Sequence, residues 1–247
     1  MSFRSLATEA PSVRRIPIPV LLFTLAGSPP SSGASAQITI LDRGQFEVAV
    51  NGRRVGTETF SIRQVGAGDE TRVIAAGQIR ATLPDGANTM DILMELTGAG
   101  WMPSAYQNKV GGEAARQIGL ELRGARFESR VTSDIGEQVK EYRAAPSTRI
   151  LERGVAHHFH FLAPPTDPGP ASVPVIVPRD GFQTEAEVVL AGTVELRIDG
   201  EVMPARHYWM RAGALRWEAW HDAAGRVLRV AENSTGYSAV RVTRPGS

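Results

Sequence analysis

The chain has 247 residues, of which 42% are hydrophobic and 21% are charged, and it contains no cysteine. These proportions are those of an ordinary folded protein, and they exclude a disordered chain, a collagen-like repeat and a disulfide scaffold. The 27 basic residues are balanced by 26 acidic residues, so we expect no basic surface for nucleic acid. Without cysteine, thiol catalysis and cysteine-based metal sites are also excluded.

The first 36 residues have the pattern of an export signal. Two arginines precede an apolar run at residues 16–26, and a stretch rich in Gly, Ser and Pro ends in Ala-Ser-Ala at residues 34–36, the kind of sequence after which signal peptidase cleaves. The apolar run is well short of the ~20 residues that a membrane-spanning helix needs. We therefore expect residues 1–36 to be a signal peptide and residues 37–247 to form a single periplasmic or secreted domain without an integral membrane segment.

After the leader, apolar and polar residues alternate with a period of two, which is typical of half-buried antiparallel strands. Residues 45–50 alternate in this way and run directly into Asn51-Gly52, the strongest short signal for a β-hairpin. In the return strand the apolar residues change faces, so we predict a bulge at Gly56. The same alternation predicts further strands at residues 90–96, 118–122, 126–131, 194–198, 215–219, 227–231 and 237–242.

These strands and the short turns between them predict an all-β fold. We expect about ten strands in a curved antiparallel sheet or incomplete barrel, with a β-sandwich as the alternative. Little helix is expected, and only near residues 150–162. Six prolines in residues 163–179 predict a loop there, because proline does not fit a central strand.

Three of the five histidines, His157, His158 and His160, fall within four positions. On a strand, His158 and His160 would share a face, as pairs of metal-ligating histidines do. A zinc site would need further ligands, for which the candidates are Glu152, His207 and His221. The alternative is an edge strand or short helix whose imidazoles meet solvent or bind backbone carbonyls. Because spacing fixes only two ligands, we favour this alternative and predict no cofactor.

Aromatic residues gather near the C-terminus, where Trp209, Trp217 and Trp220 are candidates for lining an apolar ligand pocket. Burial in the core is the alternative, since cores and pockets use the same residue types. Trp217 and Trp220 fall on opposite faces of a strand, so both can line one cavity only if the strand is bulged.

The sequence contains no phosphate loop, no dinucleotide-binding fingerprint and no His-Glu-x-x-His motif. A Gly-Tyr-Ser-Ala-Val stretch at residues 236–240 lacks the final glycine of a nucleophile elbow. We therefore assign no catalytic residue.

Two segments of the chain carry a resemblance to a known group of proteins. They are Phe46-x-Val48-x-x-x-Gly52-x-x-Val55-Gly56-x-Glu58-x-Phe60 and Trp220-x-Asp222-x-x-Gly225-Arg226-Val227-Leu228-Arg229-Val230. With these motifs, residues 44–243 resemble uncharacterised exported β-rich proteins of Gram-negative bacteria, known as domains of unknown function. The resemblance implies a curved sheet or open barrel, distantly similar in shape to the carriers that take lipoproteins across the periplasm. It implies no activity and no functional residues.

The function predicted from export and fold is that of a non-catalytic cell-envelope protein that binds a lipid or other apolar ligand on the concave face of its sheet. One alternative is a metal-assisted hydrolase that uses His158 and His160 with a carboxylate as base. Another is a structural or adaptor protein that offers a sheet edge to a protein partner, which the sequence does not identify.

Overall fold

The computed structural model describes residues 38–66, 71–98, 100–162 and 169–242. All of these residues belong to one compact unit, Ala36–Ser247. The predicted signal peptide lies outside the described residues. Within the described part, no helix has the length and apolar character needed to cross a membrane.

The described residues form fifteen strands and the short 3₁₀ helix η2. Their bounds are β1 Ile38–Val50, β2 Arg53–Val65, β3 Arg72–Ala81, β4 Ala87–Thr97, β5 Met102–Gly112, β6 Arg116–Arg123, β7 Arg126–Ser133, β8 Gly136–Arg143, β9 Arg149–Ile150, η2 His157–Leu162, β10 Ala171–Val177, β11 Phe182–Ile198, β12 Glu201–Ala212, β13 Leu215–His221, β14 Val227–Glu232 and β15 Tyr237–Arg241.

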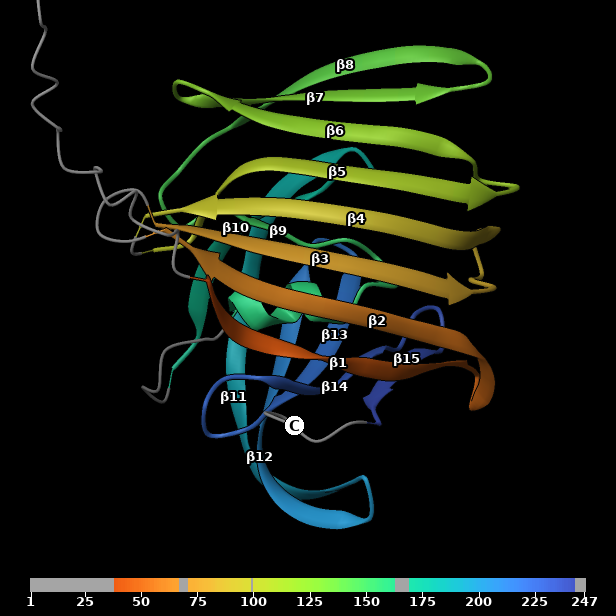
Figure 1. The fold of residues 1–247 in the computed structure, drawn as a ribbon, viewed down its shortest axis with the longest axis vertical. Coiled ribbons are helices and arrows are strands. Elements are labelled where there is room, and N and C mark those ends of the chain that lie inside the picture. Colours follow the sequence, from red (N-terminus) through yellow and green to blue (C-terminus); the bar gives the residue numbers. More distant parts are fainter. Residues whose placement is uncertain (1–37, 67–70, 99, 163–168, 243–247) are drawn as a thin grey trace, which may run out of the picture. The chain divides into compact units, whose positions relative to one another are not determined.

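All fifteen strands belong to one sheet with the order β8-β7-β6-β5-β4-β3-β2-β1-β15-β14-β13-β12-β11-β10-β9 (Figure 1). The sheet consists of two antiparallel meanders, β1–β8 and β10–β15, which meet where β1 pairs with β15. At the far end, β9 adds a parallel pair beside β10. Strands β8 and β9 are the two edges of the sheet.

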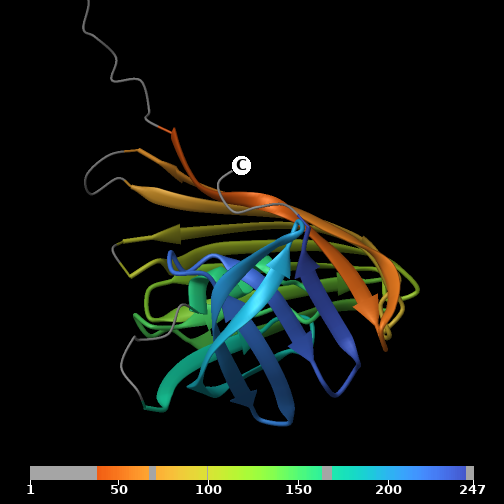
Figure 2. The ribbon, with the colours of Figure 1, turned by 90° about the horizontal axis from the view of Figure 1, so that it is seen from below.

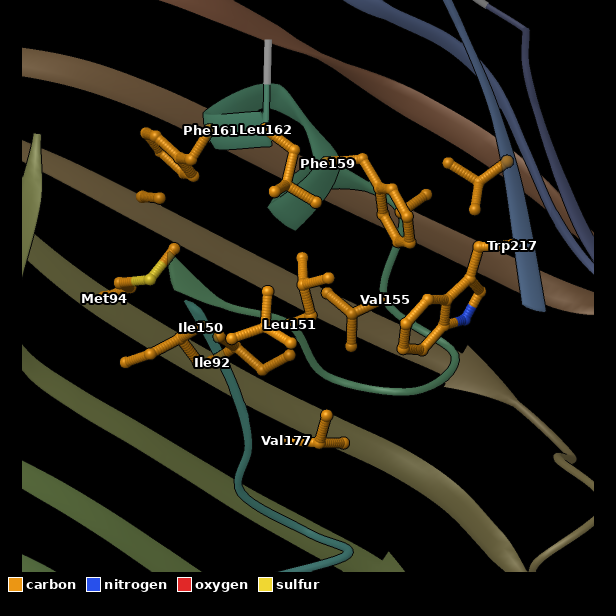
Figure 3. Packing of buried hydrophobic residues seen from close by; sticks show 14 of the residues in the cluster. Ile92, Met94, Ile150, Leu151, Val155, Phe159, Phe161, Leu162, Val177 and Trp217 are labelled. Atoms are coloured by element: carbon orange, nitrogen blue, oxygen red, sulfur yellow. The ribbon is translucent and has the colours of Figure 1, made fainter. Parts of the chain in front are cut away.

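The sheet curls so that the first meander wraps over the second, with η2 between them (Figure 2). Apolar side chains from the inner faces of both meanders and from residues 150–162 form one continuous core (Figure 3). The predicted all-β fold with a curved, largely antiparallel sheet and little helix is confirmed, with more strands than expected. The predicted short helix near residues 150–162 is η2.

The turn after β1 has the conformation that its sequence predicts. Asn51 and Gly52 both have positive φ, 51° and 76°, which is the requirement of a type I′ hairpin. The register between β1 and β2 shifts by one residue at Val55, because Val48 pairs with Gly56 while Ala49 pairs with Arg54. The bulge therefore lies one residue before the predicted position.

The predicted proline-rich loop is partly wrong, because residues 171–177 form strand β10. Pro174 lies within this strand and pairs with Glu185 of β11. Strand β9 reaches only Val175 and Ile176 on the other side of β10. Proline lacks a backbone N–H, and it is tolerated because that side of β10 has no neighbouring strand at residue 174.

Candidate functional site

We call residues 151–162 the inner segment. Eleven of its twelve residues are buried, the exception being the half-buried Arg153. Its apolar side chains pack against the inner faces of both meanders, as Leu151, Val155 and Phe159 illustrate in Figure 3. The apolar part of the concave face is therefore covered by the protein's own chain.

Glu58 of β2 holds the start of η2 in place. Its carboxylate accepts hydrogen bonds from the backbone N–H groups of Ala156 and His157, each at 2.8 Å, and lies 2.7 Å from Nδ1 of His157. Both side chains are fully buried. The His157 ring fits because residue 77 is glycine, since a Cβ there would lie 2.3 Å from Cε1 of the ring. Glu58 thus acts as an N-cap supplied by another strand.

His158 accepts a hydrogen bond from another residue of the inner segment. Its Nδ1 accepts a hydrogen bond from the backbone N–H of Glu152 at 3.2 Å, which requires the proton of the neutral ring to sit on Nε2. Burial, and then the neighbouring His157, hold the pKa of His158 well below its ordinary value of 6.5. The ring is therefore neutral at neutral pH, and its Nε2 has no partner among the described residues.

His160 and His221 lie further along the core. The His160 ring stacks on Trp101 with 5.7 Å between the ring centroids, and burial lowers its pKa to about 4. His221 donates from Nε2 to the carbonyl oxygen of Phe159 at 3.0 Å, and burial lowers its pKa to about 4 as well. Both rings are neutral at pH 7 and pack as parts of the core.

The strand that the metal hypothesis required is not formed, and the short helix of the favoured alternative is present. His158 and His160 lie on η2 and not on a strand, and two residues in a 3₁₀ helix are two thirds of a turn apart, so the two side chains do not share a face. The candidate ligand His207 lies on β12, where it contacts Glu218 and stacks on Trp220. Across the described residues, no group of three or more His, Asp or Glu side chains is placed to hold a metal ion.

Glu152 belongs to a buried polar network. The Tyr106 hydroxyl donates to its Oε2 at 3.1 Å, and Nε of Arg179 lies 3.3 Å from its Oε1. Arg179 also pairs with Asp85 at 2.9 Å and donates to the backbone carbonyl of Arg153 at 2.6 Å. Burial raises the pKa of Glu152, although Arg179 opposes that shift. The network joins the β3–β4 turn, β5, the inner segment and the end of β10.

A pocket of about 250 Å³ adjoins this network, and we call it the Tyr237 pocket. Tyr237 is 4% exposed, and its hydroxyl has no hydrogen-bond partner among the residues that the structure describes. Burial, and then the carboxylates of Glu58 and Glu232, raise its pKa well above the ordinary value of 10.0. The lining consists of Leu83, Pro84, Asp85, Arg153, Gly154, Arg179, Glu232, Thr235 and Tyr237.

The three tryptophans do not meet in one cavity. Trp217 is buried on the inner side of β13, where it packs edge-on against Phe159 (Figure 3). Trp220 belongs to a separate cluster, in which it stacks on His207 and lies beneath the guanidinium of Arg229. Trp209 is 39% exposed on β12. Trp209 and Trp217 both line a hollow of about 700 Å³ on β11–β13, and Trp220 does not. A ligand role for these residues stays a prediction.

A larger hollow of about 910 Å³ crosses strands β2–β7. Its lining includes the exposed polar side chains of Gln78, Asp91, Gln107, Lys109 and Arg130, together with the exposed Leu93. The hollow therefore offers both polar and apolar surface.

Sequence reasoning did not single out Arg179 or Tyr237, and it noted Glu58 only as part of a structural motif. Arg179 directly follows Pro178 in the segment predicted to be a loop, and Tyr237 appeared only as the start of a strand. A charged residue at the end of the apolar run Val175–Val177 was the available signal for Arg179.

No protein-family model matches the chain, and no curated protein matches it in sequence. Among solved structures, the β-barrel-like protein of domain of unknown function DUF1849 from Brucella abortus has a similar fold, with a TM-score of 0.54 and 7% sequence identity. The match covers 85% of this chain and 98% of that chain. At this identity the likeness shows the fold alone. It supports the expected resemblance to a β-rich domain of unknown function.

Proposed function

We propose that this chain is an exported, non-catalytic binding protein of the cell envelope, and that its ligand is a small polar molecule with a protonated amine, held in the Tyr237 pocket. The observation that carries the proposal is the Tyr237 hydroxyl, which is buried, lines the pocket and lacks a partner among the described residues. A buried hydroxyl without a hydrogen bond costs about 1–3 kcal/mol, and a bound ligand would recover that cost.

The charges around the pocket favour a cation over an anion. The two lining arginines already pair with carboxylates, at 2.9 Å for Arg153 with Glu232 and 2.9 Å for Arg179 with Asp85. Arg153 lies 3.5 Å from a further carboxylate, that of Asp180. These three carboxylates outnumber the two guanidinium groups even when the buried Glu152 is left aside. A ligand ammonium group can share these carboxylates and donate to the Tyr237 oxygen.

The size of the pocket limits the ligand. Its volume of about 250 Å³ lies below the range of roughly 300–1,000 Å³ that is usual for drug-sized ligands. Leu83, Pro84 and Gly154 provide an apolar wall, so a compact amine with a short carbon skeleton fits better than a strongly hydrated ion.

A lipid on the concave face, as predicted from the sequence, would require the inner segment to move, because that segment covers the apolar surface. The Tyr237 pocket needs no such movement. For this reason we propose a ligand in the Tyr237 pocket and not a lipid on the concave face.

A matched pair of small molecules tests the site. Glycinamide and N-acetylglycinamide differ in the protonated amine, and isothermal titration should show glycinamide binding at least tenfold more tightly. Tyr237→Phe removes only the hydroxyl and should weaken glycinamide binding at least tenfold. Tyr208→Phe is the control, because Tyr208 is also buried with an unpartnered hydroxyl but does not line the pocket. Equal affinity for both molecules, or no effect of Tyr237→Phe, would refute the site.

Export is tested separately. Periplasmic material from a Gram-negative host that expresses the full chain should yield a protein beginning at Gln37 by N-terminal sequencing. Recovery of an intact Met1 terminus, or of a membrane-embedded form, would contradict the export part of the proposal.

A further inference from the structure

Among the described strands, β8 is an edge of the sheet and pairs only with β7. The register fixes the direction of its backbone groups. Ala144 N–H donates to the carbonyl oxygen of Ala125 at 2.9 Å, so the neighbouring pair Arg126–Arg143 is a non-hydrogen-bonded pair of the ladder. The N–H and C=O of Arg143 therefore point away from β7.

A side chain occupies these two groups of Arg143. The amide of Gln183 accepts from the Arg143 N–H at 2.9 Å and donates to the Arg143 carbonyl at 2.7 Å. One side-chain amide thus makes the two bonds that a residue of an added strand would make. The edge geometry at this point is suited to strand pairing.

The backbone N–H and C=O groups of Glu141, Val139 and Glu137 also point away from β7, because the direction of these groups alternates along a strand. No described residue hydrogen-bonds to their outward N–H and C=O groups. Val139 is 53% exposed, and Ile135 in the preceding turn is 94% exposed. This edge is open and bears an apolar side chain at its centre.

The side chains at these positions have a charge pattern. Glu137 pairs with Arg130 and Glu141 pairs with Arg126, each at 2.6 Å, and all four groups remain largely exposed. Glu141 also lies directly opposite Glu128 of β7, a like-charge pair. A basic residue on the other side of Glu141 would offset this repulsion.

We propose that β8 binds an extended segment of a partner polypeptide, which adds a sixteenth strand to the sheet. The segment carries two basic residues separated by three positions, with an apolar residue midway between them. Its backbone pairs with the outward groups of Glu137, Val139 and Glu141. Its basic side chains face the two glutamates, and its apolar side chain covers Val139. This is strand addition, in which the main chain supplies affinity and alternate side chains supply specificity.

A second copy of this chain fits less well. In the antiparallel register that pairs all three outward residues, Glu137 of each copy lies opposite Glu141 of the other. Two like-charge pairs would then face each other directly, which destabilises a sheet.

The test uses blocked seven-residue peptides and the full mature chain. The basic peptide is Thr-Lys-Thr-Val-Thr-Lys-Thr, and the acidic control replaces both lysines with glutamate. In an NMR titration, the basic peptide should shift the amide signals of β8 and bind at least tenfold more tightly than the acidic peptide. Bound basic peptide should also slow hydrogen exchange at Val139 and Glu141. Val139→Pro should abolish this binding. It removes an outward N–H that makes no bond to β7, so the fold should be kept. Val139→Ile is the matched control and should bind as the wild type does, because it keeps both the outward N–H and the apolar side chain.

A charge-reversed variant provides an independent check. Glu137→Lys combined with Glu141→Lys should reverse the preference, so that the acidic peptide binds more tightly. Equal binding of the two peptides, unchanged binding by Val139→Pro, or a concentration-dependent dimer that β8 substitutions abolish would overturn the proposal.

Discussion

In the described part of the protein, two carboxylates contact a basic side chain that is as fully buried as they are, Asp42 with Arg241 and Glu58 with His157. The two contacts are built differently. Arg241 of β15 holds Asp42 of β1 in a fork, with Nη1–Oδ2 at 2.9 Å and Nη2–Oδ1 at 2.8 Å. Its guanidinium also donates to the carbonyls of Arg43 and Val227. Glu58 and His157 instead join a strand to the inner segment, and Nε2 of His157 has no partner among the described residues.

This difference shows how the β1–β15 junction and the inner segment are each stabilised. The pair between β1 and β15 compensates a buried charge with another charge and with backbone groups. The inner segment is held by the carboxylate cap of Glu58 and by the neutral rings of His158 and His160, each of which has one ring nitrogen without a partner among the described residues. We therefore expect a change of pH or a conservative substitution to destabilise the inner segment. The Asp42–Arg241 pair should lose stability only when one of its two side chains is removed.

The largest effect should come from Arg241→Met, which leaves the Asp42 carboxylate buried without its partner. We expect a loss of about 3–5 kcal/mol in the free energy of unfolding, measured by urea denaturation. Arg211→Met removes one side of an exposed pair with Glu187 and should change stability by less than about 1 kcal/mol. Similar losses of unfolding free energy in the two variants would contradict the distinction between the buried and the exposed pair.

Acidification should destabilise the protein through buried histidines in and beside the inner segment. His160 and His221 keep a pKa of about 4 in the folded protein, whereas the unfolded chain takes up these protons near the ordinary value of 6.5. Stability is therefore fully present above pH 6.5 and falls as the pH drops towards 4. Between pH 6.5 and 5 the loss should be about 2 kcal/mol per histidine.

Denaturation curves at several pH values check this. His160→Phe keeps a ring to stack on Trp101 and should reduce the slope by about a third, because the pKa of His158 is also lowered and one of three protons is lost. Arg211→Met, in an exposed pair with Glu187, is the control and should keep the wild-type slope. A slope unchanged by His160→Phe would show that another group controls the acid response.

Glu58→Gln should have a smaller effect, about 1–2 kcal/mol, because the amide keeps one acceptor while the charged cap is lost. The effect should also be local. Hydrogen exchange should quicken at Ala156 and His157 more than in β1 and β15. Glu47→Gln, in an exposed pair with Arg54, is the control and should leave both measurements unchanged. Uniformly faster exchange throughout the sheet would argue against a local role.

The smallest expected effect is that of zinc. His158 already accepts the Glu152 N–H, and His160 stacks on Trp101. We expect neither zinc nor a chelator to change the Tm of the wild type or of a His158→Ala, His160→Ala double variant. Zinc that survives dialysis in the wild type and is lost in the double variant would instead favour the metal-assisted hydrolase.

The strands and hairpins with regular alternation could be predicted from the sequence, because a half-buried strand needs that pattern. Strand β3 was not recognised, since its inward residues include Ala75 and Gly77, whose small size hides the alternation. Residue 77 is glycine because a side chain there would collide with the ring of His157, which lies eighty positions further along the chain. A local pattern does not contain such a requirement.

The candidate site was less predictable for the same reason. The histidine cluster was noticed because its members are adjacent in sequence, but the structure uses these side chains for packing and capping. Arg179, Glu232 and Tyr237 are brought together by the pairing of distant strands. Nothing in the spacing of these three residues indicates that they share a pocket.

The junction between β1 and β15 has a consequence for the speed of folding. Within each meander every strand pairs with its chain neighbour, so those contacts form with short loops. At the junction, Asp42 meets Arg241 across 199 positions of the chain. Closing so long a loop carries the largest entropic cost of any strand pairing in the described sheet, and slow folding is typical of such contacts. The two meanders should therefore acquire protected backbone amides early in refolding, and the Asp42–Arg241 pair should be buried only in the last, rate-limiting phase.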